Sequence, residues 1–155
     1  MSLNIDLFNP ANFSQHNLVK QLLESKVKSG NLGLGDVTYG QCDDDFGVFS
    51  FDKANTKNDP NPVTKGVHLN FQLAGIVSDE IEVKNLHVHV DWNGSTLYDE
   101  DHAQDNKYDS AYSYKLGWDV PSFAPSGHYA IKLTGTGLNE GDSGTVLCVT
   151  ADMDL

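Results

Sequence analysis

Two histidines and an aspartate alternate along one predicted strand in the middle of the chain. His87, His89 and Asp91 are separated by single apolar residues, so in an extended strand all three side chains project from the same face. Imidazole and carboxylate groups at this spacing are within reach of one metal ion. A structural zinc site needs a closed shell of four ligands, however, and no further histidine cluster follows in the sequence. We therefore predict a solvated strand face and no metal site.

Acidic residues gather at two other places where a cation could bind. Asp43, Asp44 and Asp45 are consecutive, and the run DEDHAQDNKYD extends from Asp99 to Asp109. Neither segment contains a twelve-residue calcium loop with its glycine and terminal glutamate. The second run also shows no periodicity, so we expect both segments to be solvated loops.

No set of residues predicts catalysis. Asp119 beside Trp118 has no sequence partner of the Ser/His/Asp or Cys/His kind. The sequence also lacks a glycine-rich phosphate loop and a C-x-x-C motif. We therefore expect a protein that is not an enzyme and needs no cofactor.

The overall charge restricts the partners that the chain can have. The 155 residues include 22 Asp and Glu against 10 Lys and Arg, a formal net charge of −12. Such a chain repels a phosphate backbone, which excludes nucleic acid as a partner. The charge also opposes adhesion to anionic membranes, although Lys53, Lys57 and Lys65 could support transient contact near one loop. The sequence has no bilayer-spanning apolar stretch, and the polar start MSLNIDLFNP does not resemble a signal peptide. We expect a soluble chain, either a mature secreted form or an intracellular protein.

The first 36 residues differ from the rest. Leu18, Leu22 and Val27 lie at helical spacing, which predicts an amphipathic helix near residues 14–28 within an N-terminal extension, 1–36. Such a helix could pack on a sheet, cap a cavity or bind a protein partner, and packing is the interpretation we favour because an exposed leucine stripe is adhesive.

Residues 37–155 have the alternation of short antiparallel strands. Val67, Leu69 and Phe71 alternate with polar residues, as do the residues on either side of Val88. The pair Asn93-Gly94 predicts a tight hairpin turn. About seven such strands with turns between them indicate an all-β sandwich.

Two cysteines are present, Cys42 and Cys148, 106 positions apart. A disulfide closing a loop of this length would stabilise the fold by roughly 4 to 5 kcal/mol in the chain-entropy model. Two free buried thiols are the alternative. Asn12 and Asn93 each begin an Asn-X-Ser sequon, which favours glycosylation and a secretory route.

Several segments in order resemble the ML domain, the MD-2-related lipid-recognition family, which includes the Niemann-Pick type C2 protein and fungal phosphatidylglycerol/phosphatidylinositol transfer proteins. The segments that carry this resemblance are Tyr39 to Cys42, PVTKGVHLNF from Pro62 to Phe71, the hairpin up to Tyr98, YSYKLGWDVPSFAPSGHYAIKL from Tyr112 to Leu133, and Cys148. They cover residues 37–155, and their specificity lies in their order.

The resemblance implies an immunoglobulin-like sandwich and a disulfide between Cys42 and Cys148. It also implies a lipid cavity between the sheets, with its mouth near the loop of Phe123 and Pro125, and a secreted or endolysosomal location. The chain departs from the family pattern because Asp99 to Asp109 lacks the second cysteine pair of many relatives. The predicted helix has no counterpart in the short members of the family.

The resemblance assigns a set of large apolar side chains to the lipid cavity. Bulky aromatic residues can hold two sheets slightly apart, and a lipid is then favoured by about 25 cal/mol per Å² of apolar surface that it buries. The same residues could instead fill a solid core. The set comprises Phe71, Leu73, Val88, Val90, Trp92, Tyr112, Tyr114, Trp118, Phe123, Tyr129, Ile131 and Leu133.

The predicted function is therefore reversible binding and transfer of a sterol or phospholipid. The alternative is a structural or interaction module with a closed ML-like sandwich, docked through the N-terminal helix or the acidic surface. A third hypothesis is more distant: HVHVDWNG is similar to a segment of copper-zinc superoxide dismutases.

Overall fold

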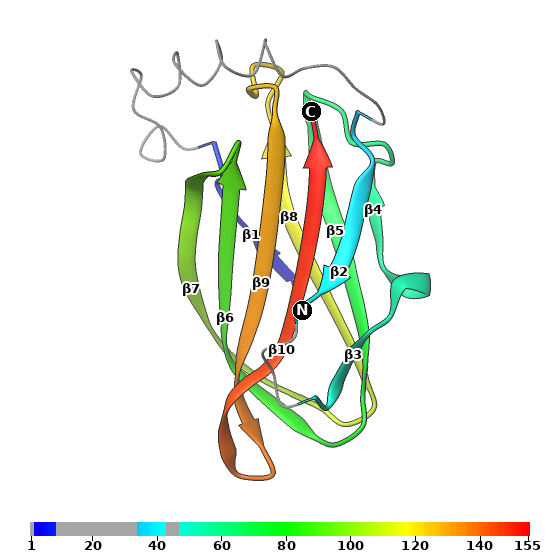
Figure 1. Cartoon of the computed structure of the whole chain (residues 1–155), viewed down its shortest axis with the longest axis vertical. Helices are drawn as coiled ribbons and strands as arrows, with labels where there is room; N and C mark the ends of the chain where they lie inside the picture. The colour runs from blue at the N-terminus through cyan, green and yellow to red at the C-terminus, as the bar shows by residue number, and fades with distance from the viewer. Residues whose placement is uncertain (1, 9–33, 43–46) are drawn as a thin grey trace.

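The computed structural model describes residues 2–8, 34–42 and 47–155 as two packed β-sheets (Figure 1). The predicted all-β sandwich is confirmed, with ten strands in place of about seven. The strands are β1 (Ser2–Asn4), β2 (Val37–Gln41), β3 (Phe49–Phe51), β4 (Lys57–Asp59), β5 (Val67–Val77), β6 (Ile81–Trp92), β7 (Ser95–Tyr108), β8 (Ala111–Val120), β9 (His128–Asn139) and β10 (Asp142–Asp154). A short 3-10 helix, η2 (Lys53–Asn55), precedes β4. The predicted helix near 14–28, the aspartates 43–45 and the sequon at Asn12 lie outside the described residues.

Five strands form each sheet. Sheet A has the order β1-β8-β5-β3, with β4 also paired to β5, and sheet B has the order β2-β10-β9-β6-β7. All pairs are antiparallel except β1 with β8, which is parallel. The long strands β5 and β8 thus face β6, β9 and β10 across the core.

The first residues of the chain belong to the sandwich, which the sequence analysis did not predict. Strand β1 pairs with Lys115–Gly117 of β8, and the ladder continues through Ile5, whose amide donates to the Gly117 carbonyl at 2.9 Å. Ile5 and Leu7 are buried in the core. The apolar side chains of this short segment are too few to show a period in the sequence, so only the tertiary packing reveals its place.

Two tight turns join the long strands of sheet B. Asn93 and Gly94 have φ values of 50° and 82°, which confirms the predicted hairpin between β6 and β7. Glu140 and Gly141 make a second turn of the same sign between β9 and β10, with φ values of 50° and 87°. Glycine adopts this left-handed region without steric cost, which explains its place at the second position of both turns.

The predicted loop from Asp99 to Asp109 is wrong, because β7 extends through Tyr108 and pairs with β6 as far as Ile81. The strand lies at the edge of sheet B, so its side chains need not be apolar. Its carboxylates instead pair across the ladder with basic side chains of β6, as Asp105 does with Lys84 at 3.1 Å. A strand held by cross-strand charge pairs has no hydrophobic period, and the sequence pattern failed for that reason.

A disulfide joins Cys42 to Cys148. Cys42 follows β2 and Cys148 lies in β10, with 5.3 Å between the two Cα atoms. The bond ties the edge strand β2 to its neighbour, where the Cys42 amide also donates to the Cys148 carbonyl at 3.2 Å. A disulfide is compatible with an oxidising, extracellular compartment. No helix among the described residues is long and apolar enough to cross a membrane.

Candidate functional site

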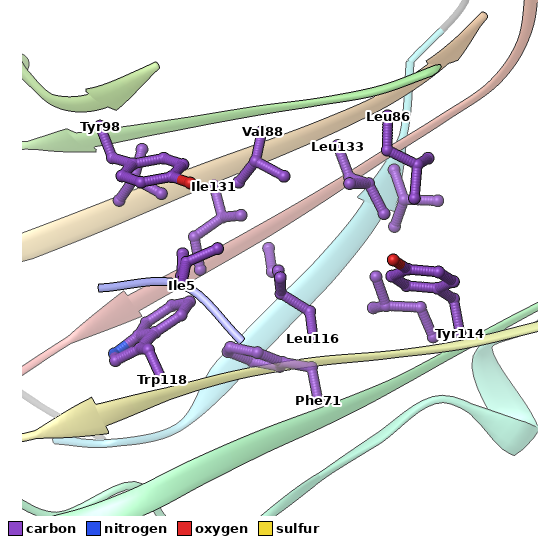
Figure 2. Packing of buried hydrophobic residues seen from close by; sticks show 14 of the residues in the cluster. Ile5, Phe71, Leu86, Val88, Tyr98, Tyr114, Leu116, Trp118, Ile131 and Leu133 are labelled. Atoms are coloured by element: carbon purple, nitrogen blue, oxygen red, sulfur yellow. The ribbon is translucent and has the colours of Figure 1, made fainter. Parts of the chain in front are cut away.

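The predicted cavity residues fall into two groups in the structure. Eleven of the twelve lie between the sheets and are at most 4% exposed. Figure 2 shows Phe71, Tyr114 and Trp118 on one side of this interior, facing Val88 and Leu133 of the other sheet. Phe123 does not join them, since 78% of its surface is exposed. Eleven of the residues assigned to the lipid cavity thus lie in the interior, and Phe123 lies on the surface of the loop where the cavity mouth was expected.

Aromatic rings of the interior pack against one another. The ring centroids of Phe71 and Trp118 are 5.3 Å apart, and those of Phe49 and Tyr112 are 5.6 Å apart with nearly perpendicular planes. Such offset and edge contacts are the favourable geometries for aromatic pairs. A Cβ atom at Gly75 would overlap the Phe49 ring, so glycine is required beneath it.

The set of predicted cavity residues leaves out two residues that the same alternation places on the inner strand faces. Leu86 and Leu116 are as deeply buried as the predicted cavity residues. Leu116 shares the inner face of β8 with Tyr114 and Trp118. Period two was the available signal for both residues. Ile5, by contrast, gave no signal, because the strand that it follows is three residues long.

Two polar atoms in this interior have no hydrogen-bond partner in the described protein. They are the Tyr112 hydroxyl oxygen and the Trp118 indole nitrogen, and both residues are at most 2% exposed. Burial raises the pKa of Tyr112 well above its ordinary value, so the phenol is neutral at physiological pH. A buried polar group without a partner costs about 1 to 3 kcal/mol, which makes both atoms exceptions that need an explanation.

Two comparable side chains at one end of the sandwich are fully paired. The Tyr129 hydroxyl donates to the Pro125 carbonyl at 2.6 Å, and the Trp92 indole donates to the Ser126 carbonyl at 3.2 Å. These bonds hold the loop that connects β8 to β9, in which Ala124 is buried. The interior thus provides partners for some of its polar groups and not for Tyr112 and Trp118.

The same loop presents Phe123 to solvent at a fixed position. Lys65 donates to the Ser126 hydroxyl at 2.7 Å, which places a cation beside the loop. Leu34, 66% exposed, precedes Gly35, whose amide donates to the Asp154 carbonyl at the end of β10. Gly127 and Leu155 exchange two backbone hydrogen bonds at this end as well. These bonds place the segments of Phe123 and Leu34 at the end of the sandwich where β10 terminates, near the C-terminus in Figure 1.

A shallow pocket lies on the outer face of sheet A and differs from the interior in chemistry. Its volume is about 280 Å³, and its lining is mostly polar: Lys57, Asp59, Asn70, Phe71, Gln72 and Lys115. Charged and amide groups of this kind do not suit a lipid tail.

The residues singled out for polar chemistry lie on outer faces. His87, His89 and Asp91 project from one face of β6, as predicted, and Asp99 of β7 lies opposite His89. An Asp119 carboxylate oxygen lies 2.7 Å from His68 Nδ1 on the exposed face of sheet A, which is a surface hydrogen bond.

The second sequon residue is part of the hairpin turn. Asn93 is half-buried, and its side-chain oxygen accepts a hydrogen bond from the His128 amide at 2.9 Å. Glycosylation at this residue or at Asn12 stays a prediction.

Comparisons with known proteins bear on the fold. No family model matches the chain, and no curated protein matches it. The C-terminal domain of wzt is similar in structure, with a TM-score of 0.51 and 10% identity over 80% of this chain and 81% of that one. Northeast Structural Genomics Consortium target SoR45 has a TM-score of 0.46 with 10% identity, over 77% of this chain and 87% of that one. A protein from Archaeoglobus fulgidus has a TM-score of 0.41 with 11% identity, over 79% of this chain and 97% of that one. The first similarity supports the two-sheet fold and nothing finer.

Proposed function

We propose that this chain is an ML-type, immunoglobulin-like sandwich that binds and transfers a sterol or phospholipid between its two sheets. The observation that supports this proposal is the pair of unpartnered polar atoms on Tyr112 and Trp118, set among aliphatic and aromatic side chains. A lipid has the matching chemistry, because it combines a large apolar body with a hydroxyl, ester or phosphate group. Such a group can accept from the Trp118 indole or pair with the Tyr112 phenol.

The energetics favour a carrier that exchanges its ligand. Each buried methylene contributes about 0.8 kcal/mol relative to water, and most of that gain is also available in a membrane. Loading then requires the interior side chains to separate as the lipid enters. Net transfer follows from small differences in free energy between protein and membrane, and no chemical step is needed.

Membrane contact in this proposal is brief and local. Phe123 and Leu34 supply exposed apolar surface at one end of the sandwich, and Lys65 supplies a cation beside Ser126 of the loop that carries Phe123. The net charge of −12 opposes prolonged binding to anionic lipids. The disulfide and the family resemblance favour a secreted or endolysosomal location.

Native mass spectrometry of the full-length oxidised protein tests the proposal. We expect an added mass that is released on denaturation and identified as a sterol or phospholipid after extraction. Dehydroergosterol or cis-parinaric acid added to delipidated protein should also quench the tryptophan fluorescence by energy transfer. Tyr112→Phe should weaken this transfer, whereas the control Tyr39→Phe, which removes a hydroxyl bonded to Asn58 at 2.7 Å, should not.

A second candidate is a closed structural module, and the close packing of the interior favours it. The eleven buried residues and the ring contacts from 4.8 to 6.3 Å are also what a solid core requires. A bare native mass together with no transfer to either probe would overturn the lipid proposal in favour of this module.

A further inference from the structure

The outer face of sheet B carries a second site, which does not depend on the proposed lipid function. Strand β6 places His87 and His89 on this face because they are two residues apart. In the antiparallel register of β6 with β7, Asp99 lies directly opposite His89, and Asp101 lies opposite His87. Three potential metal ligands therefore come from two adjacent strands, and the third is Asp99, where the sequence spacing had suggested Asp91.

The Asp99 carboxylate lies between the two imidazole rings. One of its oxygens is 2.6 Å from His87 Nε2, and the other is 2.9 Å from His89 Nδ1. One ligand atom from each of the three residues lies within 4.8 Å of the other two. A tetrahedral zinc ion with bonds of about 2.0 to 2.2 Å has ligand atoms about 3.3 to 3.6 Å apart, so small side-chain rotations would complete the arrangement.

The opposite nitrogen of each ring is held by its own carboxylate. His87 Nδ1 is 2.8 Å from Asp101, and His89 Nε2 is 2.8 Å from Asp91. Asn85 also donates to Asp101 at 2.9 Å, which fixes that carboxylate in turn. Metal-bound histidines nearly always donate their second N–H to a carboxylate or carbonyl, because this orients the ring and makes the ligating nitrogen more basic. The cluster therefore has the supporting contacts of a metal site as well as its ligands.

We propose that His87 Nε2, His89 Nδ1 and a carboxylate oxygen of Asp99 bind one Zn²⁺ ion, with the fourth position open to solvent. Asp91 and Asp101 act as positioning residues that hold the two rings. The three carboxylates supply the negative charge that a divalent cation requires. Lys132 of β9 lies opposite His89 in the ladder between β6 and β9.

His128 provides a matched comparison within the same sheet. It too lies between carboxylates, with Asp154 at 2.9 Å and Asp152 at 3.1 Å, but its cluster lacks a second imidazole among the described residues. Hydrogen bonding between histidine and aspartate is therefore common to both clusters, and the convergence of two rings on one carboxylate distinguishes the proposed site.

Titration of the full-length, oxidised, chelator-treated chain with ZnCl₂ in a calorimeter tests the proposal. We expect saturable binding of about one ion, weakened at least tenfold in His89→Gln and in Asp99→Asn. Asp101→Asn should weaken binding less while keeping the stoichiometry. The control His128→Gln should bind within twofold of the unmodified chain, and circular dichroism should confirm that every variant folds.

Histidine ring signals in NMR spectra give a second measurement on the unmodified chain. Zinc should shift the ring nitrogens of His87 and His89 and leave those of His128 unchanged. Absence of saturable binding, equal affinity in all variants, or equal weakening in His128→Gln would each overturn the site.

Discussion

The two faces of strand β6 differ in how the polar groups near them are paired. On the outer face, both ring nitrogens of His87 and of His89 lie within 2.9 Å of a carboxylate oxygen. On the inner face the strand presents only apolar side chains and Trp92, and the polar atoms of Tyr112 and Trp118, which also belong to the interior, have no partner. The ring nitrogens of the two outer-face histidines are therefore fully paired without a ligand. In the interior, by contrast, these two polar atoms carry the cost of burial without a hydrogen bond.

We expect the buried interior to supply most of the stability of the sandwich and the outer face to supply little. The disulfide is the main exception, because it stabilises the fold from the outer face. Cys148 pairs in the ladder with Thr134, so both lie on the outer side of sheet B, and the Thr134 hydroxyl is 3.8 Å from the Cys148 sulfur. The bond closes a separation of 106 residues, so its removal by Cys42→Ala/Cys148→Ala should lower the free energy of unfolding by about 4 to 5 kcal/mol. Urea unfolding followed by circular dichroism measures the change, and a loss below about 1 kcal/mol would show that the crosslink does not restrict the unfolded chain.

Adjacent residues of β6 test the division directly. Leu86 is 1% exposed in the interior, whereas the neighbouring His87 side chain is 35% exposed on the outer face. We expect Leu86→Ala to lower the free energy of unfolding by about 3 kcal/mol, because it removes buried methylenes and leaves a cavity. His87→Ala should cost less than about 1 kcal/mol in zinc-free buffer. Equal costs in the same urea experiment would contradict the division of roles.

The interior could be predicted from the sequence largely because its signal is local. Val88, Val90 and Trp92 alternate with polar residues, and a period of two assigns them to one face before any partner strand is known. The turn at Asn93-Gly94 was also predicted locally, from the residue types of the pair. The exposure of Phe123 could not be predicted in this way, because it lies in a loop between two prolines, where alternation has no meaning and the hydrogen bonds from Tyr129 and Trp92 hold the chain.

The polar clusters depend on register, which the sequence alone does not reveal. Asp99 approaches His87 and His89 only because β7 pairs with β6 without interruption from Tyr98 to His102. The sequence predicted a loop from Asp99 to Asp109, so Asp91 was the only carboxylate expected near the two histidines. The sequence also could not predict that Tyr112 and Trp118 lack hydrogen-bond partners, because that depends on the position of every neighbouring element.

Removing one hydroxyl at a time sharpens the contrast between paired and unpaired interior groups. Tyr112→Phe deletes a buried hydroxyl without a partner, so in lipid-free protein it should raise the free energy of unfolding by about 1 kcal/mol. Tyr129→Phe deletes a hydroxyl that donates to Pro125 at 2.6 Å and should lower it by about 1 kcal/mol. Both changes keep the ring, and urea unfolding compares them. If Tyr112→Phe also destabilises, the hydroxyl has a partner in solution and the main support for a ligand disappears.

The smallest expected effect is a pH dependence on the outer face. Burial acts to lower the pKa of His128, but the hydrogen bonds from its ring to Asp154 and Asp152 outweigh burial and raise the pKa above its ordinary value of 6.5. A histidine with a raised pKa in the folded state contributes stability that is fully present below the unfolded pKa and is lost as pH rises through the folded pKa. The unmodified chain should therefore exceed His128→Gln by up to about 1 kcal/mol at about pH 6, and by less at about pH 8.5. Asp152→Asn/Asp154→Asn should abolish this pH dependence in urea unfolding, and a difference that stays constant or grows with pH would show that the two carboxylates do not favour the charged ring.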